Sequence, residues 1–258
     1  MGNIDRHAPG SFCWIELGTS DQDAAKHFYS SLLGWGATDN PMGTGDFYTT
    51  FDLRGRKIGG GYNISKLMPG VPSHWMLYIC VTDADATVAK AKAAGAKIPC
   101  ETIDVMEYGR MAVLQDPTGA HVSIWQPKSH PGFQIEREAG SMCWADLMSP
   151  DQDKAKTFYH DVFGWELDPG QDKSGYLHIK NGNDYIGGIP PAKHRPPNAP
   201  PHWLLYIQVE SCDVSSNKAS DLGAKVMFAP MTMENVGRWS IIADPQGAVF
   251  SLFEPMRR

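Results

Sequence analysis

The sequence lacks a long hydrophobic run, an excess of positive charge and a paired-cysteine motif. Its apolar stretches fall short of the roughly 20 residues that a membrane helix needs, so no membrane partner is expected. A net charge of -6 provides no basic surface for a phosphate backbone, which argues against a nucleic-acid partner. The first ten residues have neither the basic start nor the apolar core of a secretory signal, and we therefore expect a cytoplasmic protein.

The five cysteines are few and scattered. They stand at positions 13, 80, 100, 143 and 212, and none belongs to a CxxC pair. We expect mostly buried thiols with a packing role, and neither a metal nor a redox function.

What the sequence does contain is an internal duplication. The stretch "FCWIELGTSDQDAAKHFYSSLLGW" returns 130 residues later as "MCWADLMSPDQDKAKTFYHDVFGW", and "PSHWMLYICV" returns 128 residues later as "PPHWLLYIQV". This period is far longer than the 20 to 50 residues of a solenoid repeat. The duplicated unit is therefore a whole domain.

Each copy is expected to contain two β-α-β-β-β units. In the first unit an alternating stretch, 11–17, is followed by the helix-capping candidates Ser20 and Asp21 and by a helix that ends at Gly34. The second unit begins at His74 and has a helix over about 83–94. Alternating strands imply sheets with one face against helices. The free faces of two such sheets are expected to form a cup.

The combination of "FY…GW" at the end of the helix and "DPxG" before the last strand, present in both copies, resembles the vicinal oxygen chelate superfamily. This superfamily includes glyoxalase I, bleomycin resistance proteins and extradiol dioxygenases. The resemblance implies an α+β protein with two tandem glyoxalase-like domains, 1–127 and 140–258, joined by a linker over 128–139. Each domain would be a pair of βαβββ units, with mixed sheets curved into a cup and helices outside. Fold ancestry alone does not determine a reaction.

The resemblance also implies where metal ligands would stand in the family. Those positions fall on Trp14, Met76 and Ser123 in the first copy and on their counterparts Trp144, Leu204 and Ser251 in the second. Indole, alkyl, thioether and lone hydroxyl groups cannot replace the imidazole and carboxylate ligands of such an ion. We therefore predict no metal site at these positions.

Strand parity predicts what lines the cups instead, because residues two apart in a strand share a face. Both linings combine aromatic rings with a few polar groups, as small-molecule sites do. The predicted ligand-binding residues are Trp14, Met76, His121, Ser123 and Trp125 in the first copy, and Trp144, Asp146, His202, Leu204, Tyr206, Ser251 and Phe253 in the second.

The glycines of "IGGGYNI" and "IGGIPPA" do not form a phosphate loop, since no helix with Lys-Ser/Thr follows them. We expect them to permit a bend or the close approach of another part of the chain.

Three functions stay open at this point. The first is a cofactor-free protein that binds a small aromatic or planar molecule in a hydrophobic cup. The second is a lyase, isomerase or dioxygenase-like enzyme. It would be either metal-free, with Glu16, His74 and Tyr78 as catalytic residues, or dependent on a divalent metal held by the shifted ligands Glu16, His74 and His121. The third is a scaffold with filled cups, in which Glu16 is a structural carboxylate. A monomer with an internal pseudo-dimer, or a homodimer, fits each of them.

Overall fold

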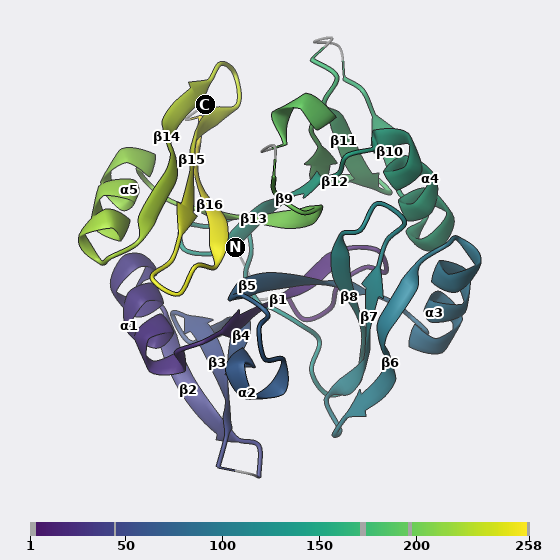
Figure 1. Cartoon of the computed structure of the whole chain (residues 1–258), viewed down its shortest axis with the longest axis horizontal. Helices are drawn as coiled ribbons and strands as arrows, with labels where there is room; N and C mark the ends of the chain where they lie inside the picture. Colours follow the sequence, from purple (N-terminus) through teal and green to yellow (C-terminus); the bar gives the residue numbers. More distant parts are fainter. Residues whose placement is uncertain (1–3, 44, 171–173, 196–197, 257–258) are drawn as a thin grey trace.

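The computed structural model describes residues 4–43, 45–170, 174–195 and 198–256. It contains two eight-stranded mixed sheets, with helices at the periphery of the molecule (Figure 1). This confirms the predicted α+β architecture of tandem glyoxalase-like domains. Within the described residues, none of the helices is long and apolar enough to cross a membrane.

The first sheet is built entirely from the first copy, in the order β2-β3-β4-β1-β5-β8-β7-β6. Its elements are β1 (Phe12–Thr19), α1 (Gln22–Leu33), β2 (Gly36–Pro41), β3 (Phe47–Leu53), β4 (Arg56–Asn63), α2 (Ile64–Leu67), β5 (His74–Cys80), α3 (Ala84–Ala93), β6 (Lys97–Val105), β7 (Gly109–Gln115) and β8 (His121–Pro127).

The second sheet repeats this order as β10-β11-β12-β9-β13-β16-β15-β14. Its elements are β9 (Met142–Met148), α4 (Gln152–Phe163), β10 (Glu166–Asp168), β11 (Leu177–Asn181), β12 (Asp184–Ile189), a 3₁₀ turn (Ala192–His194), β13 (His202–Gln208), α5 (Cys212–Asp221), β14 (Lys225–Met233), β15 (Gly237–Ala243) and β16 (Val249–Pro255).

The two units of one copy join through their first strands. β1 pairs antiparallel with β5, while β1–β4 and β5–β8 are parallel pairs. The second copy has the same pattern about β9 and β13. The units thus pair within a copy, so that each cup belongs to one copy.

Capping residues mark the ends of helices α1 and α4. The side chain of Asp21 accepts a hydrogen bond from the amide of Ala24 and caps α1. Gly34 ends the helix with φ of 74°, a left-handed conformation that glycine adopts without a steric penalty. Asp151 and Gly164 bound α4 in the same way.

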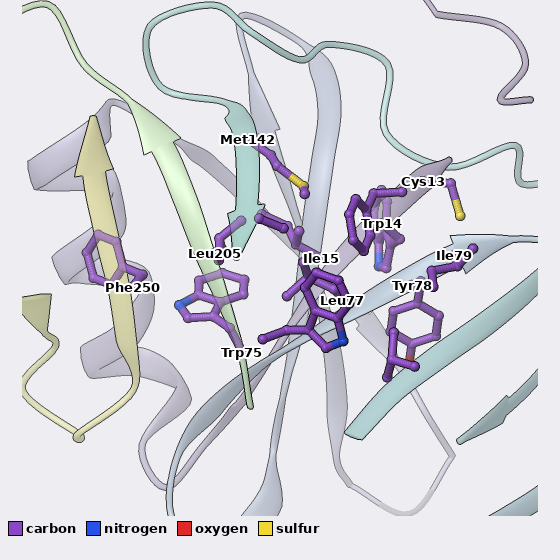
Figure 2. Packing of buried hydrophobic residues seen from close by; sticks show 14 of the residues in the cluster. Cys13, Trp14, Ile15, Trp75, Leu77, Tyr78, Ile79, Met142, Leu205 and Phe250 are labelled. Carbon is purple, nitrogen blue, oxygen red and sulfur yellow. The ribbon is translucent and has the colours of Figure 1, made fainter. Parts of the chain in front are cut away.

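The core lies between the two copies. One cluster of buried side chains runs through both, and Figure 2 shows Leu205 of the second copy beside Trp75 of the first. Helix α1 contacts α5, and α3 contacts α4 (Figure 1). The helix-facing sides of the sheets therefore face each other across this core, and the cup faces point outward.

Reciprocal hydrogen bonds cross this core. The hydroxyl of Tyr29 donates to Asp244 Oδ2 over 2.9 Å, and the hydroxyl of Tyr159 donates to Asp116 Oδ2 over 3.0 Å. All four residues are buried. Since Tyr29 and Tyr159 belong to the "FY" motif and the two aspartates to "DPxG", the residues that carry the family resemblance also hold the copies together.

Candidate functional site

A carboxylate held by two tyrosines lies on the concave face of the first sheet. Glu16, on β1, accepts hydrogen bonds from Tyr78 of β5 (2.6 Å, to Oε2) and from Tyr48 of β3 (2.9 Å, to Oε1). The indole N–H of Trp14 donates to the hydroxyl of Tyr48 over 2.9 Å. Burial raises the pKa of Glu16, and the two phenol hydrogen bonds lower it in part.

The second copy repeats this arrangement with an aspartate. Asp146, on β9, accepts from Tyr206 of β13 (2.8 Å, to Oδ2) and from Tyr176 (2.5 Å, to Oδ1), which lies just before β11. Trp144 Nε1 donates to both Tyr176 (2.8 Å) and Asp146 Oδ1 (3.1 Å). Burial raises the pKa of Asp146 to about 6, despite three donors that favour the charged form.

A glycine makes room for the tyrosine in each cluster. A side chain at Gly60 on β4 would collide with the hydroxyl of Tyr48, and one at Gly188 on β12 would collide with that of Tyr176. These glycines belong to the stretches in which the sequence predicts a close approach. The structure shows that the approaching group is a phenol of the cup.

The structure brings some predicted residues together and leaves others apart. Trp14, Glu16 and Tyr78 join one cluster, and Trp144, Asp146 and Tyr206 join the other. Met76 lies directly across from Glu16 in the sheet, and Leu204 lies across from Asp146.

The histidines stand apart from the carboxylates. His74 Nδ1 bonds to the carbonyl of Pro72 (2.9 Å), and His202 Nδ1 bonds to that of Pro200 (2.8 Å). His121 stands at the start of β8, where partial shielding of its ring from water and the nearby His74 lower its pKa. Among the predicted catalytic residues, then, Glu16 and Tyr78 share a hydrogen bond, while His74 binds its own turn.

Ser123 and Trp125 of the first copy have different contacts from their counterparts Ser251 and Phe253 in the second. Ser251 Oγ donates to the carbonyl of Ser240 over 2.8 Å, whereas the buried Ser123 Oγ has no hydrogen-bond partner among the described residues. Trp125 Nε1 donates to the carbonyl of His130 over 2.9 Å, and Phe253 lies edge-on to Tyr206.

A divalent metal does not fit these residues. Both oxygens of Glu16 already accept phenol hydrogen bonds, and the shifted set Glu16, His74 and His121 does not converge. Across the described ranges, no group of three or more His, Cys, Asp or Glu side chains is placed to hold a metal ion. We therefore derive no chemistry through a metal.

Sequence reasoning missed Tyr48 and Tyr176, which complete the two clusters. Both are separated from the carboxylates by a helix and at least one strand, so strand parity does not reach them. The repeat offset of 128 residues does relate Tyr48 to Tyr176 and Gly60 to Gly188. The presence of the same residue types at this offset, tyrosine and glycine, was the signal in the sequence that could have pointed to these positions.

Two of the cavities formed by the described residues lie away from the cups. One of about 350 Å³ lies at the start of α1, where its lining includes Asp21, Lys26 and Phe47. The other, of about 430 Å³, has a lining that includes Pro117 and Phe158. Neither is lined by a residue of the two carboxylate clusters. Within the clusters, Tyr78 (4% exposed) and Asp146 (6%) are buried.

Comparison with known proteins matches this architecture. A family model described as the Glyoxalase/Bleomycin resistance protein/Dioxygenase superfamily matches residues 11–124 and 132–252. The chain is 37% identical over 267 residues to "Putative glyoxylase CFP32" of Mycobacterium bovis, covering 99% of this chain and 98% of that protein. It is 31% identical over 269 residues to the anthracycline biosynthesis protein DauV of Streptomyces sp. strain C5, covering 97% and 95%.

Solved structures share the fold at much lower identity. The Mn(II)-bound glyoxalase from Novosphingobium aromaticivorans has a TM-score of 0.67 at 16% identity, covering 96% of this chain and 83% of that one. The 2,3-dioxygenase LapB from Pseudomonas sp. KL28 has a TM-score of 0.65 at 15% identity, covering 100% and 94%. With both of its copies matched, the chain belongs to the glyoxalase/bleomycin resistance protein/dioxygenase superfamily.

Proposed function

We propose that this protein binds a small planar or aromatic molecule on a cup face, without a metal ion. The observation that carries this proposal is the duplicated cluster of one carboxylate, two phenols and one indole on the cup face of each sheet. A carboxylate shielded from water is costly unless it is hydrogen-bonded. Glu16 in the first copy and Asp146 in the second each accept hydrogen bonds from two tyrosines. Rigid, hydrogen-bonded rings provide a preorganised surface for a flat ligand.

A relative supports the choice of ligand class. DauV is named for anthracycline biosynthesis, and anthracyclines are flat fused-ring compounds. This relative suggests only the flat shape of the ligand, which the aromatic lining of the cups also favours.

The experiment is tryptophan fluorescence quenching by a panel of flat aromatic compounds, before and after exhaustive dialysis against EDTA. We expect saturable quenching with the same Kd in both preparations. Tyr176→Phe should weaken binding, because it frees the ring of Trp144 and uncovers Asp146. The exposed Tyr185→Phe serves as the matched control. Absence of saturable quenching across the panel, or quenching that needs added metal, would overturn the proposal.

A second candidate is a metal-free acid–base enzyme centred on Asp146. A carboxyl whose pKa lies at about 6 both gives and accepts protons near neutral pH. Against it stand the three donors that already occupy Asp146. Glyoxalase and dioxygenase assays on the EDTA-treated protein test this candidate. Activity that Asp146→Asn abolishes while probe binding persists would favour it over binding alone.

A further inference from the structure

The first cup is closed by the linker between the copies. The ring of His130 lies edge-on against Trp14, with centroids 4.6 Å apart, and also contacts Trp125 at 5.9 Å. The amide of Phe133 donates to the carbonyl of Cys13 over 2.7 Å, and its side chain is 1% exposed. Trp14 and Trp125 are consequently buried as part of the main core cluster.

The second cup has a more open lining. Its residues form a cluster separate from the main core, in which Trp144 and Phe253 are only half-buried. The counterparts of these two residues in the first copy are the buried Trp14 and Trp125. The second cup therefore presents aromatic surface that the first one covers.

This aromatic surface continues outward over the neighbouring strands. Phe253 pairs with Trp239 of β15, which pairs in turn with Met231 of β14. Trp239 and Phe228 stack face to face, 4.8 Å apart at 4°. Phe228 and Met231 are 41% and 42% exposed. The first copy has Cys100 and Met111 where the second has Phe228 and Trp239, so it lacks this aromatic pair.

Trp239 faces the cup. Its neighbour Arg238 turns to the helix side, where it bonds to Asp213 of α5 over 2.6 Å, and successive strand residues point to opposite faces. The indole Nε1 of Trp239 is buried, yet it has no hydrogen-bond partner among the described residues. An unpaired buried N–H is costly and marks a place where an acceptor is missing.

We infer that the two cups have different roles: the first is a filled structural unit, and the second receives a flat fused-ring ligand with a carbonyl acceptor for the N–H of Trp239. This rests on the proposed function and assigns it to one cup and one ligand class. The stacked rings of Phe228 and Trp239 supply the contact for the flat ligand. Aromatic rings attract a further ring in an offset or an edge-to-face arrangement. The indole N–H of Trp239 distinguishes ligands with a carbonyl acceptor from ligands without one, because a ligand without an acceptor leaves this N–H unpaired.

The experiment compares two probes of equal charge, anthraquinone-2-sulfonate and anthracene-2-sulfonate, which differ in the two carbonyl groups. Their affinities are measured by isothermal titration calorimetry with the full chain. The second-cup variants are Trp239→Phe and Phe228→Ala, and the matched first-cup variants are Met111→Ala and Cys100→Ala. Thermal melts verify that each variant is folded. Trp239→Phe removes the unpaired N–H and keeps a smaller aromatic ring at this position.

The expected result is a pattern across the variants. Trp239→Phe should weaken binding of the quinone about fivefold, as the loss of one neutral hydrogen bond does, and leave the anthracene probe unchanged. Phe228→Ala should weaken both probes about tenfold. The first-cup variants should change neither probe by more than about twofold.

Other results would overturn the inference. If the first-cup variants weaken binding, or if Trp239→Phe leaves the quinone unchanged, the assignment to the second cup fails while ligand binding itself stands. If neither probe binds but the wider aromatic panel does, the ligand class is wrong. A panel without any binding compound overturns the proposed function as well.

Discussion

His130 shows how one residue of a linker alters a whole cup. Its ring fills the space beside Trp14 and contacts Trp125, while its backbone carbonyl accepts the indole hydrogen bond of Trp125. Burial, together with the nearby Lys57 and His7, lowers the pKa of His130 to about 4. The residue is therefore neutral over the physiological range, as its aromatic surroundings require.

The stability of the protein should consequently depend on pH through His130. Between pH 6.5 and about 4 the unfolded chain binds a proton at this residue that the folded chain does not. The free energy of unfolding should thus fall as pH drops through this window, by about 3 kcal/mol at most. Urea unfolding of His130→Gln across pH 4 to 7 should show a flatter dependence, whereas the exposed His27→Gln should keep the parental slope. Equal slopes for all three proteins would contradict this account.

At the scale of the element, β4 and β12 are strands whose glycines shape the cup. Gly60 and Gly188 leave space for the hydroxyls of Tyr48 and Tyr176 above the sheet. The sequence predicted a close approach at these glycines but not its partner, because Tyr48 comes from another strand, β3, and Tyr176 from the residue just before β11. Which group fills the space depends on the pairing of β3 with β4 and of β11 with β12.

Adding one methyl group at these positions should displace a tyrosine. We expect Gly60→Ala and Gly188→Ala each to cost about 1 to 3 kcal/mol of unfolding free energy, the range for overpacking. Gly188→Ala should also weaken probe binding at the second cup. Gly61→Ala is the control, because its side chain would point to the other face and meet Phe51 and Leu17 at 3.2 to 3.5 Å. Chemical denaturation measures the stabilities, and an equal loss at Gly61 would argue against a specific role for the tyrosine space.

At the scale of the molecule, the two copies form one folded body. Tyr159 donates to Asp116 of the other copy and accepts from Trp203 Nε1 of its own, and Tyr29 does the same with Asp244 and Trp75. Trp35 and Trp165 donate to the carbonyls of Gly140 and Gly10, again across the copies. The "FY", "GW" and "DPxG" motifs are recognisable in the sequence, but their inter-copy contacts are not.

Tyr159→Phe should therefore destabilise both copies together. The substitution removes the hydrogen-bond donor to Asp116 Oδ2 and the acceptor of Trp203 Nε1, at a cost of about 2 kcal/mol. Unfolding followed by tryptophan fluorescence and by far-UV circular dichroism should still give coincident transitions, because the core is shared. Tyr185→Phe, at an exposed hydroxyl, should change stability by less than about 0.5 kcal/mol. Separated transitions in the parent protein would show that the copies unfold independently.

The sequence by itself determined the duplication, the helix caps and the faces of the strands, because these depend on residues close together in the chain. It thereby placed Trp14, Glu16 and Tyr78 on one face, with no metal-ligand set at the family positions. Only the tertiary structure decided that each cup forms within one copy, that Tyr48 and Tyr176 complete the carboxylate clusters, and that His130 covers the first cup. Those contacts join segments separated by many residues, and the packing of complete sheets brings them together.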